Sequence, residues 1–251
     1  MALIKSTQEI EKMRAAGNIL AQVLKKLGES ITPDQTTPRE LDTIARQMIE
    51  NAGGTPSFLN YRGYPASTCI SVNDTVVHGI PNDVPLTNGD IVSLDLGVFL
   101  NGWHADSAWT FPVGTISNEA QRLLNVTRES LFQGIAKAKV GNRIGDIGAA
   151  VQKYVESNGY SVVRDLVGHG IGQKLHEDPA SIPNYGQAGK GELLREGMTI
   201  CIEPMVNAGT HQVKTLTDGW TVKTKDGALS AHFEHTIAIT KDGPQLLTVL
   251  A

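Results

Sequence analysis

A weak internal repeat is the feature that most constrains how this chain can fold. The segment 40–53 resembles the segment 146–159 in its aliphatic positions and its closing glycine. The segment 86–95 resembles the segment 194–203, at a nearly equal offset and with matching leucine, glycine and aliphatic positions. Chance similarity of amphipathic segments could explain one match. These two and a third, between residues 104–106 and 232–234, occur in the same order and favour a duplicated unit. The repeat predicts two related halves packed around a pseudo-twofold axis.

Each repeated segment carries a carboxylate that the axis would bring to the middle of the molecule. Asp95 ends one copy of the strand-like segment and Glu203 ends the other. His104-Ala105-Asp106 likewise resembles His232-Phe233-Glu234, at a somewhat larger offset along the chain. We therefore expect each half to deliver two carboxylates to a shared centre.

Hydrophobic spacing predicts a single α+β unit without a low-complexity linker. Capping boxes at Ser6–Glu9 and at Thr37–Glu40 open two helices, and Asn101-Gly102 is typical of a hairpin turn. The predicted helices cover residues 7–27, 38–52, 118–140 and 146–157. The predicted strands cover residues 67–72, 90–99, 107–113, 161–167, 198–203, 232–240 and 246–250. We expect one domain over residues 1–251, with halves of roughly 1–115 and 116–251.

Composition excludes several functional classes. A net charge of −4, a pI near 6.0 and no long basic run argue against specific nucleic-acid binding. The most apolar run, residues 91–100, is too short for a membrane span and contains Asp95. The first residues have no signal-peptide pattern, and two cysteines, Cys69 and Cys201, make no disulfide framework. We therefore expect a cytoplasmic protein with no membrane partner.

The carboxylates in apolar strands need a counter-charge. Asp95 lies within Ile91–Gly97, and a lone buried carboxylate is costly unless it is paired or coordinates a metal. A buried salt bridge or a strand-end cap is the alternative for Asp95 and Glu203. Asp106 and Glu234 are expected to be less buried. Four acids without a matching set of Lys or Arg would repel one another, and divalent cations would remove that repulsion.

Three histidines stand in or near glycine-containing turns. His169 lies within Gly168–Gly172, where the glycines predict a sharp turn that leaves the imidazole open. A surface histidine in a glycine-rich turn is the alternative. His176 follows seven positions later, and His78 lies in Val77–Pro81, where a structural role is the commoner explanation. The glycine spacing does not fit a dinucleotide-binding fingerprint.

A carboxylate-rich site with one imidazole suits Mn²⁺, Fe²⁺, Co²⁺ or Zn²⁺. Two such ions bridged by carboxylates can lower the pKa of a bridging water and create a hydroxide that hydrolyses amides, esters or phosphates. The sequence has no His-Glu-x-x-His, no Cys-x-x-Cys and no Gly-x-Ser-x-Gly, so zincin, zinc-finger and serine hydrolase chemistry are excluded.

The ordered motifs closely resemble those of the type I methionine aminopeptidases, over essentially the whole chain. They are Val77–Pro81, Asp95, Asp106, Gly168–Gly172, His176, Ile202–Met205 and Glu234–Thr236. The resemblance implies the pita-bread fold: two α+β halves related by pseudo-twofold symmetry around a central antiparallel sheet. It also implies a dinuclear-metal exopeptidase that removes the N-terminal methionine from nascent proteins and peptides and prefers a small second residue.

The resemblance further implies metal-site roles for individual positions. Asp95 would chelate one of two divalent ions, Asp106 and Glu234 would bridge both, and His169 and Glu203 would complete the second. The resulting bridging hydroxide would attack the scissile carbonyl.

The implied catalytic residues are three. Glu203 would also shuttle the proton to the leaving amine. His176 would hydrogen-bond the scissile carbonyl, and His78 would contact the amide being cleaved.

The substrate pocket and partners are implied in the same way. The methionine pocket maps to Tyr61, Tyr64, Cys69 and Trp220, with His78 and His176 at its reactive end. A monovalent-cation site maps to Asn73, Thr75 and Ser230. Nascent polypeptide N-termini, met at the ribosome, would be the partners of a monomeric cytoplasmic enzyme.

Three positions depart from the common pattern of that family. Arg62 replaces a frequent His, Leu166 replaces an aromatic residue, and Leu175 replaces a frequent Phe. None is a predicted metal ligand, so the departures concern the rim of the methionine pocket rather than hydrolysis itself.

Two rival interpretations remain open at this point. A pita-bread peptidase of the proline dipeptidase or aminopeptidase P kind would share the five ligands, but such enzymes usually carry a further N-terminal domain. Here the catalytic half already uses the residues that precede His78. A metal-free binding module would normally have lost ligands, whereas all five are present.

Overall fold

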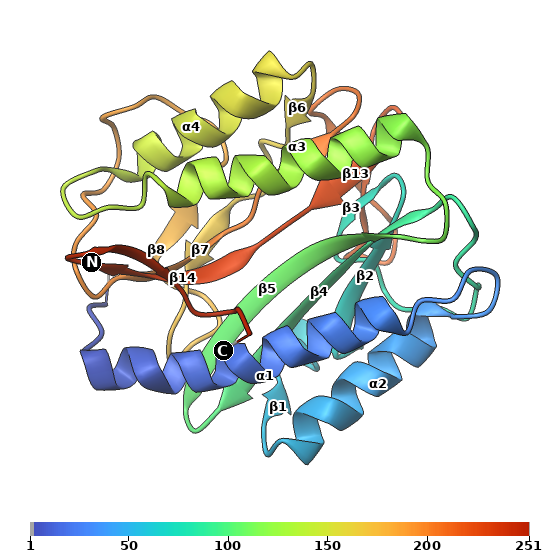
Figure 1. Ribbon diagram of the computed structural model, residues 1–251, viewed down its shortest axis with the longest axis horizontal. Coiled ribbons are helices and arrows are strands. Elements are labelled where there is room, and N and C mark those ends of the chain that lie inside the picture. The colour runs from blue at the N-terminus through green and yellow to red at the C-terminus, as the bar shows by residue number, and fades with distance from the viewer. Residues whose placement is uncertain (1–2, 251) are drawn as a thin grey trace.

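The computed structural model describes residues 3–250 of the chain. Four helices lie in two pairs on opposite sides of the strands (Figure 1). They are α1 (Thr7–Glu29), α2 (Pro38–Asn51), α3 (Asn118–Ile135) and α4 (Ile144–Ser157). Among the described residues, no helix is both long and apolar enough to cross a lipid bilayer.

Local capping fixes where the first two helices begin. Ser6 accepts a hydrogen bond from the backbone N–H of Glu9, whose carboxylate accepts from the backbone of Ser6, and Thr37 and Glu40 form the same box for α2. The predicted starts are therefore confirmed. The third helix was predicted to reach residue 140 but ends at Ile135, where the chain enters turns.

The first sheet belongs to the N-terminal half and is antiparallel throughout. It contains β1 (Thr55–Pro56), β2 (Thr68–Val72), β4 (Ile91–Leu100) and β5 (Trp103–Pro112). Asn101 and Gly102 join β4 to β5 with φ angles of 50° and 86°, as a type I′ turn requires. The predicted hairpin is confirmed, although β5 begins at Trp103 rather than at the predicted Ser107.

The second sheet belongs to the C-terminal half and is also antiparallel. It contains β7 (Gly168–Gly170), β8 (Glu177–Ile182), β9 (Thr199–Ile202), β14 (His235–Thr240) and β15 (Gly243–Leu246). The prediction of a strand over 246–250 was wrong, because the turn that returns from β14 starts the ladder at Gly243.

Two small three-stranded sheets complete the architecture. One contains β3 (Thr75–Val77), β11 (Val213–Thr215) and β12 (Val222–Thr224), and the other β6 (Ser161–Val162), β10 (Met205–Asn207) and β13 (Ser230–His232). The strand predicted over 161–167 is confined to β6, because β10 offers it only two ladder positions.

Each half has its own hydrophobic core. One core packs α1 and α2 against β4, with Leu20, Leu41 and Leu94 fully buried. The other packs α3 and α4 against β9 and β14, around residues such as Leu131 and Ile200. A fully buried leucine contributes about 1.5–3 kcal/mol. The predicted division near residue 115 falls in the loop between β5 and α3, and as a domain boundary it stays a prediction.

Hydrogen bonds between β5 and the start of β14 join the two halves. Glu234 donates its backbone N–H to the carbonyl of Ala108 at 2.8 Å, and Ser107 Oγ donates to the carbonyl of Glu234 at 2.5 Å. The hydroxyl of Thr236 accepts from the backbone N–H of Asp106 and donates to its carbonyl. The seam therefore places acids from both halves next to each other.

Candidate metal centre and substrate pocket

Strand geometry explains how the N-terminal half presents its two acids. Side chains alternate along a strand, so Leu94 and Leu96 enter the core under the helices while Asp95 faces the opposite side. Asp95 pairs with Ala108 and Gly97 pairs with Asp106 across the β4–β5 ladder. The two carboxylates are therefore diagonal neighbours on one face of the hairpin.

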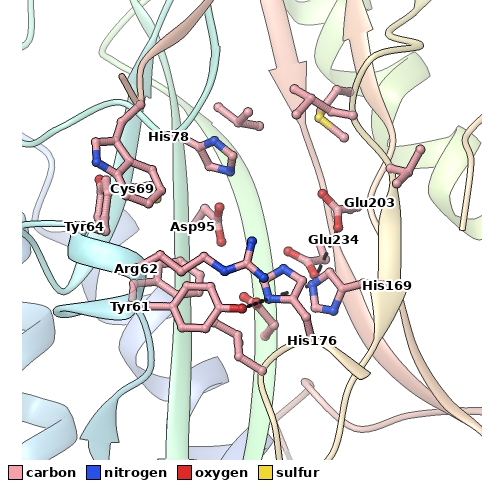
Figure 2. A pocket seen from close by; sticks show the side chains of 18 of the residues that line it. Tyr61, Arg62, Tyr64, Cys69, His78, Asp95, His169, His176, Glu203 and Glu234 are labelled. Atoms are coloured by element: carbon pink, nitrogen blue, oxygen red, sulfur yellow. Dashed lines mark hydrogen bonds and ion pairs between the residues drawn. The ribbon is translucent and has the colours of Figure 1, made fainter. Parts of the chain in front are cut away.

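The C-terminal half supplies its acids at the ends of strands. Glu203 directly follows β9, and the side-chain amide of Asn184 donates to its carbonyl at 2.9 Å. Glu234 directly precedes β14. Figure 2 shows Asp95 on one side of the cavity and Glu203 and Glu234 on the other. The expectation that Asp106 and Glu234 are less buried was wrong, since their exposed fractions are 4% and 2%.

His169 lies in β7 rather than in the sharp turn that its glycine neighbours predicted. The glycines are needed because β7 is closely packed: a Cβ at Gly168 would lie 2.3 Å from the carbonyl oxygen of Cys201, and one at Gly170 would lie 2.7 Å from that of Glu177. The imidazole is buried, and its Nδ1 hydrogen-bonds the carbonyl of Gly170 at 2.9 Å. That bond leaves Nε2 with a free lone pair aimed at the acids.

The five predicted ligands converge on one point. Ligand atoms of Asp95, Asp106 and Glu234 all lie within 4.8 Å of one another. His169 Nε2 lies 3.9 Å from Asp106 Oδ2 and 3.8 Å from Glu203 Oε1. The repeat and the strand pattern predicted that the four acids would cluster. The fold brings these acids together and places His169 beside them.

The unsatisfied atoms of this cluster fit divalent cations. Buried oxygens of Asp95, Asp106 and Glu234 have no hydrogen-bond partner among the described residues. Arg62 is the only Lys or Arg among the described residues that line the pocket, and its guanidinium stacks over the ring of Tyr61. Buried, unpaired carboxylate oxygens beside a neutral imidazole form the donor set that divalent transition metals prefer.

Burial also controls protonation in the cluster. Desolvation raises the pKa of Asp95 to about 8, and it raises the pKa values of Asp106, Glu203 and Glu234 well above the usual range, with mutual repulsion adding to the shift. Desolvation lowers the pKa of His169 to about 3, so that imidazole is neutral at pH 7. Cations would reverse the carboxylate shifts, since they favour the ionised form.

A cavity of about 330 Å³ connects these acids to the predicted methionine pocket. Its walls include all the residues predicted to bind substrate, namely Tyr61, Tyr64, Cys69, His78, His176 and Trp220. The Tyr64 hydroxyl is hydrogen-bonded to the carbonyls of Thr68 and Gly79, and the Tyr64 ring meets that of Trp220 edge to face at 5.1 Å. The apolar wall is thus held rigidly.

The two pocket histidines are held differently. His176 Nδ1 lies 2.8 Å from the Tyr61 hydroxyl, a contact drawn as a dashed line in Figure 2. Desolvation and the charge of Arg62 lower the pKa of His176 to about 4. His78 has a φ of 59°, a left-handed conformation that is strained for a residue with a side chain and is typical of functional sites. Both imidazoles border the acids and the methionine pocket.

The three departures from the family pattern lie in this pocket. Arg62, Leu166 and Leu175 all contribute to its lining. The predicted monovalent-cation residues lie outside that lining. The backbone N–H of Ser230 donates to the carbonyl of Asn73 at 2.9 Å, and Thr75 begins β3 two residues further on. Cation binding there stays a prediction.

His232 and Cys201 lie beside the acids without lining the cavity, and sequence reasoning missed both. His232 is buried, both of its ring nitrogens lack hydrogen bonds, and its Nε2 lies 3.7 Å from Glu203 Oε2. Cys201 Sγ lies within 4.8 Å of ligand atoms of His169 and Glu234, although burial raises the pKa of its thiol. The signal for His232 was present, because it stands two residues before Glu234 as His104 stands before Asp106.

Comparison with known proteins identifies the family to which the chain is similar. The model of metallopeptidase family M24 matches residues 11–241. A methionine aminopeptidase of Clostridium perfringens is 55% identical over 250 residues, and the match covers 100% of both chains. The crystal structure of the Rickettsia prowazekii methionine aminopeptidase superposes with a TM-score of 0.97 at 44% identity, covering 99% of this chain and 100% of that one.

A more distant structure shows how far the fold extends. The prolidase of Pyrococcus furiosus has a TM-score of 0.79 at 24% identity, and the match covers 100% of this chain but 66% of that one. At that identity the likeness shows the shared pita-bread fold alone. By the full-length matches, the chain belongs to metallopeptidase family M24 and, within it, to the methionine aminopeptidases.

Proposed function

We propose that this protein releases the N-terminal methionine from peptides and nascent proteins and prefers a small second residue. One observation carries the proposal: the five predicted metal ligands and the predicted methionine pocket line a single cavity of about 330 Å³. A cleft of this size with apolar walls and a polar end suits one amino-acid side chain and the peptide bond beside it.

Two divalent ions, Mn²⁺, Fe²⁺, Co²⁺ or Zn²⁺, would be held by the clustered residues. Asp95 would chelate one ion, Asp106 and Glu234 would bridge both, and His169 and Glu203 would complete the second. When bound, such ions supply a water nucleophile at neutral pH and polarise a carbonyl.

The chain's own residues would perform the remaining tasks. Tyr64, Cys69 and Trp220 would enclose the methionine side chain, whose thioether makes favourable contacts with aromatic rings. Glu203 would take up and release the proton that reaches the leaving amine. His176 would donate a hydrogen bond to the scissile carbonyl, and His78 would contact the amide.

The proposal extends to a monomeric cytoplasmic enzyme that meets nascent chains at the ribosome. Its two cysteines are buried and free, as suits a reducing compartment. A monovalent cation bound by Asn73, Thr75 and Ser230 would brace the loop between β2 and β3.

A peptide assay tests the function. Protein loaded with Mn²⁺ or Co²⁺ should release methionine from Met-Gly-Met-Met and leave a Met-Lys peptide intact, and the metal-free protein should be inactive. Free methionine is measured by chromatography. Release of the first residue from X-Pro peptides instead would favour the proline-specific rival, and failure to take up metal would favour the binding module.

A further inference from the structure

A buried ion pair outside the cavity ties the start of the chain to the loop that carries His176. Lys5 Nζ lies 2.6 Å from Glu177 Oε2, and the exposed fractions of the two side chains are 4% and 2%. Glu177 Oε1 accepts the backbone N–H of Lys174 at 3.0 Å, and Lys5 Nζ also donates to the carbonyl of Leu3 at 3.2 Å. Both oxygens of the buried carboxylate are therefore satisfied.

Stability alone does not explain such a pair. Removing two charges from water consumes most of what their attraction returns, so a well-packed apolar pair would serve a core equally well. A buried pair does, however, fix geometry, because each charge tolerates few positions of the other. The question is which geometry this pair fixes.

The pair holds the segment that runs from β7 to β8. This segment carries His169 and His176, the two pocket imidazoles that the C-terminal half contributes. Glu177 is the first residue of β8 and pairs with Gly170 across the β7–β8 ladder. Gly172 packs so closely against the pair that a Cβ there would lie 2.6 Å from Lys5 Cε, and its carbonyl accepts the backbone N–H of His104 at 2.8 Å. The segment is thus clamped between the first residues of the chain and the N-terminal hairpin.

Neighbouring residues direct their side chains to opposite sides here. His176 lines the cavity, whereas Glu177 does not line it and reaches Lys5 instead. Fixing the carboxylate of Glu177 therefore fixes the side on which His176 emerges. Inside the cavity the Tyr61 hydroxyl holds His176 Nδ1 at 2.8 Å, so the imidazole is oriented from both ends.

We propose that the Lys5–Glu177 ion pair is a positioning device that aims His176 at the scissile carbonyl. Lys5 and Glu177 are positioning residues, since neither contacts the cavity and each acts through His176. The inference rests on the proposed function, because it needs His176 to act on the substrate.

The test is a set of double-mutant cycles between each member of the pair and His176. Lys5→Met and Glu177→Gln each remove one charge at nearly constant shape, and Lys12→Met removes an exposed lysine of α1 as a control. For each variant, kcat and KM are measured on Met-Gly-Met-Met, Mn²⁺ affinity by calorimetry, and the unfolding midpoint by thermal denaturation. The same substitutions are then made in a His176→Ala background.

We expect Lys5→Met and Glu177→Gln each to lower kcat about tenfold, a fraction of the roughly 10²–10³-fold loss when an oxyanion donor is removed. KM and Mn²⁺ affinity should change less than twofold, and Lys12→Met should match the unmodified protein. In the His176→Ala background neither substitution should lower kcat further, because residues that act through one another are not additive.

Three results would overturn the inference. They are an equal loss of kcat with and without His176, an unchanged kcat in both single variants, and a His176→Ala protein of normal kcat. If Lys5→Met does not fold, Glu177→Gln, which keeps an oxygen for Lys174, decides the question alone. An inactive unmodified protein would instead count against the proposed function, so the two failures are distinguishable.

Discussion

The two halves present their acids on similar strand pairs that differ in continuity. β4 and β5 pair at ten successive positions around a two-residue turn, and Asp95 and Asp106 lie within that ladder. β9 and β14 pair at four positions, and Glu203 and Glu234 lie just beyond the paired residues. The chain between those two acids makes a long excursion that contains β10 to β13.

This difference in continuity means that the two acids of the N-terminal half are held more rigidly than the two of the C-terminal half. A carboxylate inside a continuous ladder is fixed by the hydrogen bonds of both strands, whereas one at a strand end is held by fewer. The Glu203 side chain is 13% exposed and that of Asp106 is 5% exposed. Under the proposed function, the N-terminal acids would anchor metal, while Glu203, at the matching repeat position to Asp95, would also exchange a proton.

The largest expected effect is on kcat, and it distinguishes substitution of Glu203 from substitution of Asp95. We expect Glu203→Gln to lower kcat by about 10²–10⁴-fold even at saturating metal, because a general acid–base group contributes that much. Asp95→Asn should chiefly weaken Mn²⁺ affinity and regain part of its activity as Mn²⁺ is raised. Steady-state kinetics over a series of Mn²⁺ concentrations measure both. Near-full activity of Glu203→Gln would remove the proton-transfer role.

Sequence reasoning succeeded where the determining contacts are local or repeated. The caps at Ser6 and Thr37 and the Asn101-Gly102 turn depend on residues close together in the chain, so their structures follow from short patterns. Asp95 and Glu203 were found because one strand pattern occurs twice. To predict that these acids cluster, we needed only the assumption that the two copies pack together.

Sequence reasoning failed where distant segments decide the structure. The glycines around His169 were interpreted as a turn, but Gly168 is required by the carbonyl of Cys201, which belongs to a different strand, β9. The partner of Glu177 is Lys5, close to the start of the chain. His232 repeats the position of His104, but the repeat does not show its contact with Glu203, which the fold alone creates.

The prediction of intermediate size concerns the metal-free protein. It is about how protonation of the four acids, two from each half, changes the free energy of unfolding with pH. The folded-state pKa of Asp95 is raised to about 8, and those of the other three acids are raised as well. At pH 7 the unfolded chain has released the Asp95 proton, whereas the folded chain still holds most of it. The raised pKa values of the other three acids act in the same direction, so the free energy of unfolding falls as pH rises. The buried histidines oppose this trend only below pH 7, because their pKa values are lowered from 6.5.

We therefore expect the EDTA-treated protein to lose stability between pH 7 and 8, by up to about 1.4 kcal/mol per pH unit for each retained proton. Urea denaturation at a series of pH values measures the slope. Mn²⁺ should abolish it, since bound cations favour the ionised acids. Asp95→Asn is the matched variant and should flatten the slope of the metal-free protein. A slope near zero would mean that the four acids are already ionised in the folded protein without metal.

The smallest expected effect tests whether the ladder of the N-terminal half is the stiffer support. Gly102, in the β4–β5 turn, and Gly227, in the excursion between β12 and β13, both have positive φ angles and open space at the Cβ position. An alanine at either site is strained by about 1 kcal/mol if the backbone cannot move. We expect Gly102→Ala to lower the free energy of unfolding by that amount, because the two-residue turn is fixed by ten ladder positions. Gly227→Ala should cost less than half as much, because its longer connection can relax. Urea denaturation of both variants measures the difference, and equal losses would mean that the C-terminal excursion is as rigid as the hairpin.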